Sequence, residues 1–191
     1  MRDIFIRLGG LVTLIILLVG GFLFWDHYRN KKLQELSYEE YEVSKLMQAG
    51  NYLKARELIK STSSKEGPFK PLLLSYELYM EVHWEEKIDE GKVLAEILKN
   101  LKDRDLFAFY RERYAYYLFK QGKHQEALRE LEGVKETDFN YMSAMLLKAQ
   151  ILQKNGKIKE AKEALKKLRE QGSETYFANM AQALELMGES K

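Results

Sequence analysis

The segment Phe119–Leu128, with the sequence FKQGKHQEAL, contains residue types that could carry out chemistry. Gly122 followed by Lys123 could hold a phosphate, because a glycine lets the backbone approach the anion and a lysine supplies positive charge. His124 precedes Glu126 by two residues, and such a pair could transfer protons as general acid and base. The alternative is that these residues build a turn between two helices, and the rest of the chain decides between the two interpretations.

The same pattern occurs again further along the chain. The segment from Ala115 to Leu131 recurs 34 residues later, and a weaker copy surrounds Gly50. The repeated positions are small or apolar: glycine at Gly50, Gly122 and Gly156, alanine at Ala55, Ala115, Ala127, Ala149 and Ala161, and leucine at Leu118, Leu131, Leu152 and Leu165. A period of 34 residues, with glycine in a turn and alanine five residues later, is typical of tetratricopeptide repeats.

Each repeated position has a structural role. Glycine adopts the left-handed backbone that ends the first helix, and the small alanines let two helices approach closely. Hairpins of this kind leave an apolar face uncovered, so neighbouring hairpins stack on one another. In this pattern Gly122 forms a turn and His124 occupies a packing position, as Tyr52 and Ile158 do in the other copies. The repeat therefore favours architecture over catalysis for this segment.

No other motif indicates a catalytic, cofactor-binding or metal site. The three histidines, His27, His83 and His124, fall in different segments, and the HExxH, GxSxG and complete phosphate-loop motifs are absent from the sequence. The chain has no cysteine, and its net charge of +2 includes no basic stripe. We therefore expect a protein that is not an enzyme, with no cofactor, no metal, no nucleic-acid partner and no small-molecule substrate.

The N-terminal region differs from the rest of the chain. The 18 residues Leu8–Trp25 carry no charge, and as a helix rising ~1.5 Å per residue they nearly span the hydrocarbon layer of a membrane. The run lacks the small residues of a signal-peptide cleavage site and ends near Trp25 and Tyr28, which suit a membrane interface. We predict a transmembrane anchor at residues 8–25 after a short tail at 1–7. Basic residues flank both sides, so charge leaves the orientation open.

The remaining residues, 26–191, predict a tetratricopeptide-like repeat domain. No glycine or proline occurs between Asp26 and Ala49, so the anchor helix could continue into the first repeat helix. The other segments that we expect are a polar loop at 60–67, the two helices of a degenerate repeat near 67–87 and 91–101, and a capping helix at Ser173–Gly188. The predicted fold class is all-α: a single N-terminal transmembrane helix, then a tetratricopeptide-like helical-hairpin solenoid with a C-terminal capping helix.

Aromatic residues are concentrated in the first helix of the third copy, at residues 106–119. Mapped on the repeat, several of its side chains project to the surface that lines the inner groove of such solenoids. The candidate partner-binding groove consists of Phe109, Glu112, Tyr116, Phe119, Leu146 and Gln150. Aromatic surface in a groove suits apolar peptide segments, although the degenerate repeat or a second copy of the chain could equally cover it. Lysine and asparagine ladders at these positions are missing, which disfavours capture of a terminal carboxylate.

The layout of the whole chain resembles a known family. A membrane helix that ends in the aromatic cluster Gly21–Trp25 leads into a charged helix, about four tetratricopeptide-like repeats and a short helical end. This arrangement is similar to that of the YfgM-like ancillary subunit of the bacterial SecYEG translocon. Members of that family often carry a longer tail before the membrane helix than the seven residues found here.

The resemblance implies a location and partners. It places the N-terminus in the cytoplasm, the anchor in the bacterial inner membrane and the repeat domain in the periplasm. It also implies association with the Sec translocon and envelope chaperones, in a role that handles exported polypeptides. Two other interpretations stay open: a structural or assembly subunit of another envelope complex, and a membrane-bound hydrolase, for which the sequence offers no nucleophile and base.

Overall fold

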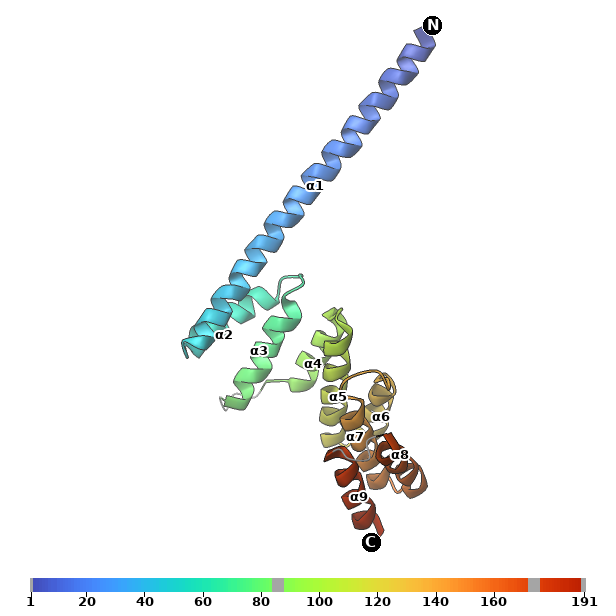
Figure 1. The fold of residues 1–191 in the computed structure, drawn as a ribbon. Coiled ribbons are helices and arrows are strands. Elements are labelled where there is room, and N and C mark those ends of the chain that lie inside the picture. Colours follow the sequence, from blue (N-terminus) through green and yellow to red (C-terminus); the bar gives the residue numbers. More distant parts are fainter. Residues whose placement is uncertain (1, 84–87, 172–175, 190–191) are drawn as a thin grey trace. The chain divides into compact units, whose positions relative to one another are not determined.

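The computed structural model describes the backbone of residues 2–83, 88–171 and 176–189, without the side chains of 2–9, 11–13, 82–83 and 187–189. This described part is all-α, which confirms the predicted class (Figure 1). Its helices are α1 Arg2–Gln48, α2 Tyr52–Ser63, α3 Lys70–His83, α4 Glu90–Asn100, α5 Arg104–Lys120, α6 His124–Glu132, α7 Tyr141–Lys154, α8 Ile158–Gln171 and α9 Tyr176–Glu189. The chain divides into two compact units, Met1–Glu77 and Leu78–Lys191, with the boundary inside α3.

In the first unit, α1 is one helix without a break. It passes from the apolar run through the charged segment to Gln48, which confirms the expectation that the helix continues into the first repeat. Among the residues whose side chains are described, no helix is long and apolar enough to cross a membrane. The side chains of residues 8, 9 and 11–13, which belong to the predicted anchor, lie outside that description.

The C-terminal part of α1 packs against α2, and Figure 1 shows the two helices lying alongside each other. Val43 of α1 and Ala55 and Ile59 of α2 are fully buried. A further hydrogen bond joins α1 to α3, where the hydroxyl of Tyr76 donates to Oε1 of Glu40 at 3.1 Å. The α1–α2 hairpin is therefore held by an apolar seam, and a polar contact joins it to α3.

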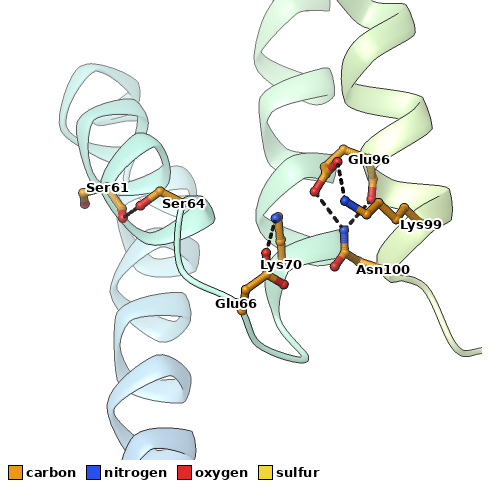
Figure 2. Close-up of polar contacts among 7 residues, drawn as sticks. All are labelled: Ser61, Ser64, Glu66, Lys70, Glu96, Lys99 and Asn100. Carbon is orange, nitrogen blue, oxygen red and sulfur yellow. Dashed lines mark hydrogen bonds and ion pairs between the residues drawn. The ribbon is translucent and has the colours of Figure 1, made fainter.

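The connection after α2 is shorter than the polar composition predicts. Helix α2 continues to Ser63, so the first residues of the expected 60–67 loop are helical. Serine hydroxyls satisfy carbonyls of this last turn, since Ser64 Oγ donates to the carbonyl of Ser61 at 2.7 Å. Lys70 Nζ then pairs with Glu66 Oε1 at 3.1 Å where α3 begins (Figure 2). The prediction of a loop from residue 60 was therefore wrong. The serine side chains bond to backbone carbonyls at the end of the helix, so a polar composition is compatible with a last helical turn.

In the second unit, consecutive helices from α4 to α9 pack on one another. Helix α7 also contacts both α5 and α9, so α5, α7 and α9 share one layer, as the first helices of stacked hairpins do. The main core cluster is built from α5, α6 and α7 together with Val134 and with Ala161 of α8, and a second cluster joins α7, α8 and α9. Stacked hairpins in this unit are the architecture that the 34-residue period predicts.

The three repeat turns use the same backbone geometry. Gly50, Gly122 and Gly156 have φ of 69°, 75° and 73°, the left-handed region that an L side chain avoids. At Gly122 the amide N–H donates to the Phe119 carbonyl at 3.0 Å, and the next amide, of Lys123, donates to the Leu118 carbonyl at 2.9 Å. The amides of the other two glycines, and of the residue after each, donate equivalent hydrogen bonds. This pair of bonds is the Schellman motif, which satisfies the last carbonyls of a helix.

The degenerate region contains helices near the predicted positions. Helix α3 has Pro71 in its first turn, where a proline costs no hydrogen bond, and Asp89 caps α4 by accepting from the amide of Lys92 at 3.0 Å. At the other end of α4, Asn100 Nδ2 donates to the carbonyl of Glu96 at 2.8 Å (Figure 2). Residues 84–87 of the first predicted helix lie outside the described residues.

The last helix extends beyond its predicted end. Helix α9 continues through Gly188 to Glu189, so the glycine does not stop it. The proposed cap, Ser173, lies outside the described residues. Ala178 and Ala181 of α9 are buried, and α9 contacts α7 and α8. The helix therefore covers the end of the stacked pairs, as the position of a capping helix requires.

Candidate protein-binding groove

A groove in the second unit is lined by one face of α5 and the corresponding face of α7. Its α5 residues, spaced three and four apart and hence on one helix face, are Phe109, Glu112, Arg113 and Tyr116. Its α7 residues are Ser143, Leu146, Leu147 and Gln150, each 34 positions after an α5 residue. The cavity has a volume of about 590 Å³. Two successive repeats therefore contribute the same four positions to one surface.

Two further segments complete the lining. Phe139 and Asn140 come from the connection before α7, and Phe177 comes from α9. Phe139 is 68% exposed, Tyr116 51% and Phe109 41%. The rings of Phe109 and Tyr110 meet in a T-shaped arrangement, with centroids 5.2 Å apart. The groove thus presents exposed aromatic side chains at its border.

Asn140 ties the α7 side of the groove to α5. Its side chain is buried, and its Nδ2 donates to the carbonyl of Ala108 at 3.0 Å and to Oε2 of Glu112 at 2.7 Å. Because both acceptors lie on α5, the asparagine fixes the spacing of the two helices. It also fixes the orientation of the Glu112 carboxylate, which lies in the groove.

A second polar contact holds the same connection. Asp138 is buried and accepts from Arg104 Nη2 at 2.9 Å and from the amide of Lys135 at 2.8 Å. The guanidinium also donates to the hydroxyl of Thr137 at 2.7 Å. The hydrogen bond from the Lys135 amide is the main reason that the pKa of Asp138 is lowered, and Arg104 lowers it further. These contacts position Phe139 and Asn140, which follow directly in the chain.

Arg113 is already engaged by acidic residues outside the groove. Its Nη2 lies 3.5 Å from Oε1 of Glu90 on α4. Glu81 is also nearby: burial raises its pKa, the charge of Glu90 raises it further, and the charge of Arg113 lowers it. The positive charge of Arg113 is therefore compensated by residues that do not line the groove.

The structure brings together five of the six residues that the sequence predicts for the groove: Phe109, Glu112, Tyr116, Leu146 and Gln150. Phe119 lies elsewhere. Its ring is partly buried against the α5–α7 core and 5.3 Å from the ring of His124. The equivalent position in the next repeat is Gln153, whose Nε2 donates to the carbonyl of Leu184 on α9 at 3.0 Å. Phe119 and Gln153, which share this repeat position, therefore both make contacts within the protein.

The segment around Gly122 forms a turn, as the repeat pattern predicts. His124 is half-buried, and its Nδ1 donates to Oδ1 of Asn155 in the following repeat turn. Lys123 and Glu126 are exposed. The alanines assigned to close helix contacts, Ala55, Ala115, Ala127, Ala149 and Ala161, are all fully buried. His124 therefore joins two turns through its contacts with Phe119 and Asn155.

The lining also includes residues outside the predicted set: Arg113, Phe139, Asn140, Ser143, Leu147 and Phe177. Arg113 and Leu147 could have been found, because they lie one position after two predicted residues and 34 residues apart from each other. Phe139 and Asn140 precede a helix outside the repeat pattern, and Phe177 belongs to the helix after the last repeat. Their place depends on how distant segments pack.

The stacked hairpins and the groove on their first helices define a helical-repeat protein with an interaction surface. Comparison with known proteins agrees: residues 6–185 match the tetratricopeptide repeat-like domain, and the chain belongs to this family. It is also 31% identical over 182 residues to an uncharacterised protein of Aquifex aeolicus (strain VF5), covering 95% of this chain and 94% of that protein. No solved structure matches the chain.

Domains of this family typically bind protein partners as non-enzymatic scaffolds. The class of function that follows is a protein–protein interaction module.

Proposed function

We propose that this protein is a membrane-tethered interaction module of the bacterial cell envelope that binds polypeptides in the groove between α5 and α7. One observation carries the proposal: two successive repeats present the same four positions to one cavity, with exposed aromatic rings at its border. Solenoids of helical hairpins typically use such a surface to bind other proteins. Exposed aromatic side chains supply large contact areas at low entropic cost.

The tether rests on the sequence of the first helix. The run at residues 8–25 carries no charge, and its described residues from Leu14 to Phe24 are exposed. Trp25 and Tyr28 follow, with ring centroids 6.4 Å apart, in the place that an interfacial aromatic belt would occupy. Since α1 continues unbroken to Gln48, an anchor in this position would hold the first repeat close to the membrane.

The partners that we propose follow from the resemblance to the YfgM-like family. They are the Sec translocon, envelope chaperones and exported polypeptides. In this proposal the N-terminus is cytoplasmic, the anchor lies in the inner membrane and the repeats are periplasmic. Anchor and repeats together would keep a polypeptide-binding groove beside the site of export.

A photoreactive amino acid at Tyr116 tests the groove. We expect it to crosslink envelope proteins or nascent chains in living cells, because Tyr116 is 51% exposed in the groove. The matched control is the same amino acid at Lys159, an exposed α8 residue outside the groove lining. Equal crosslinking from both positions would contradict the proposal. The readout is immunoblotting and mass spectrometry of the adducts.

The alternative of an assembly subunit predicts a different complex. A single stoichiometric partner after gentle solubilisation would favour assembly, whereas a spread of transient clients favours polypeptide handling. Blue native electrophoresis of the wild-type membrane fraction distinguishes the two outcomes.

A further inference from the structure

The groove contains a carboxylate whose charge is uncompensated among the described residues. Glu112 accepts a hydrogen bond from the neutral amide of Asn140 at 2.7 Å. Within the described part of the chain, no cation lies within ion-pair distance of it. A cationic partner stabilises a carboxylate on a largely apolar surface, because the surrounding aromatic rings reduce the screening of the charge–charge attraction by water.

The other charged residue of the lining does not change this balance. Arg113 is paired with Glu90, which lies outside the groove, and it also faces Glu81. The lining itself contributes no lysine. The groove is therefore electrostatically complementary to a positive charge.

The exposed rings attract the same sign of charge. The faces of Phe109, Tyr116 and Phe139 carry the negative part of an aromatic quadrupole, and a guanidinium or ammonium group within about 6 Å of a ring is attracted to it. Tyr116 follows Glu112 by one helical turn on α5, and Phe109 precedes it by nearly one turn. A cation paired with Glu112 would thus lie between two aromatic faces.

We propose that the groove selects polypeptide segments that combine basic and apolar side chains. A lysine or arginine of the segment pairs with Glu112, and a neighbouring apolar side chain contacts Tyr116, Leu146 and Phe177. From Phe109 to Tyr116 the α5 face is about 10 Å long at ~1.5 Å per residue, which matches about three extended residues at ~3.3 Å each. This inference rests on the proposed function and specifies its substrate class.

Fluorescence anisotropy with the full chain in detergent micelles tests the inference. The probes are two labelled peptides of about 12 residues with the same leucines and phenylalanines, one with lysines and the other with glutamates at the remaining positions. We expect the lysine peptide to bind at least about tenfold more tightly, with a preference that decreases at high salt.

Glu112→Gln should remove most of this preference while retaining an oxygen that accepts from Asn140. We expect about a tenfold loss of affinity for the lysine peptide and little change for the glutamate peptide. Glu163→Gln, at an exposed residue of α8, is the matched control and should change neither affinity. Circular dichroism of each variant checks that the helices are retained.

The outcomes separate the inference from the proposed function. Equal affinity of wild-type protein for both peptides, or no effect of Glu112→Gln, overturns the charge selection. If Tyr116→Ala still weakens both peptides in that case, the groove remains a polypeptide-binding site. If neither peptide binds and Tyr116 also forms no specific crosslinks, both proposals fail. A dimer that buries Tyr116 and excludes both peptides would identify a second copy as the occupant and would likewise overturn the inference.

Discussion

Asp138 and Asn140 flank Phe139 in the connection between α6 and α7, and both reach back to α5. Asp138 accepts from Arg104 at the first residue of that helix, and Asn140 donates to the carbonyl of Ala108 one turn later. Each contact joins residues more than 30 positions apart. Together they position an exposed aromatic ring and a carboxylate at the groove. Asp138 does so from outside the groove lining, and Asn140 does so as a buried residue of the lining.

The charge of Asp138 should make stability depend on pH in the acid range. Its pKa in the folded protein is lowered from 3.8, so the folded state binds fewer protons there than the unfolded state. The stabilisation is complete above pH 3.8 and is lost as the pH falls through the lower, folded-state pKa. We expect Asp138→Asn to reduce the free energy of unfolding by about 1–3 kcal/mol at neutral pH and by less near pH 3.

Urea unfolding at a series of pH values measures this difference. Glu163→Gln, whose side chain is exposed on α8, provides the control and should give a nearly constant difference. A loss for Asp138→Asn that is the same at neutral pH and near pH 3 would show that its charge does not stabilise the fold.

At the scale of the elements, one face of α5 contains both groove residues and a residue that packs against the core. On α5 the positions of Phe109, Glu112 and Tyr116 remain at the groove, whereas Phe119 lies one further step along the same face and is partly buried. Phe119 lies in the last turn of α5, next to the start of α6, and its ring contacts that of His124. This side chain therefore packs inside the hairpin instead of facing a partner.

The left-handed turn at Gly122 should be sensitive to a side chain for conformational reasons alone. A Cβ at this position would meet no atom within 4 Å, so space is available, but φ is +75°. We expect Gly122→Ala to destabilise the second unit by about 1–2 kcal/mol. Gly122→Asn should cost less, because asparagine tolerates the left-handed region better than alanine does.

The neighbouring residue offers a matched control. Gln121 has φ of −83°, a region open to all L residues, and is exposed. Gln121→Ala should change stability by less than about 0.5 kcal/mol. Thermal unfolding followed by circular dichroism compares the three variants, and equal melting temperatures for Gly122→Ala and Gln121→Ala would argue against strain at the turn.

At the scale of the whole molecule, the family match spans residues 6–185 and so includes both the long first helix and the repeats. Helix α1 joins the two parts, because it continues without a break from the apolar run to Gln48, just before the first repeat turn. In the proposed arrangement, the apolar run anchors the protein and the repeats lie on the outer side of the inner membrane. This topology gives a direct prediction for the intact protein.

Protease added to intact spheroplasts should digest the repeat domain. The reason is that lysines and arginines on the exposed faces of the helices offer cleavage sites to trypsin once the repeats face the outside. A cytoplasmic protein in the same sample must stay intact as the control for membrane integrity. Protection of the repeats, while a known periplasmic protein is digested, would overturn the proposed topology.

Much of the fold could be predicted because it depends on local and periodic properties. Gly50, Gly122 and Gly156 each need a backbone that only glycine adopts easily, and the buried alanines recur at fixed distances from them. The same register assigned Phe109, Glu112, Tyr116, Leu146 and Gln150 to one surface. The errors, at the loop from residue 60 and at the end of α9, concern helix ends, where weak local preferences compete.

The sequence by itself determined the period, the turns, the close helix contacts and the face of each first helix that forms the groove. These follow from residue size and backbone freedom at positions a fixed number of residues apart. The tertiary structure alone decided that Phe119 is partly buried, that Phe139 and Phe177 join the groove and that Asn140 orients Glu112. The places of Phe139, Asn140 and Phe177 depend on packing between segments about 30 positions apart, and no local pattern specifies such contacts.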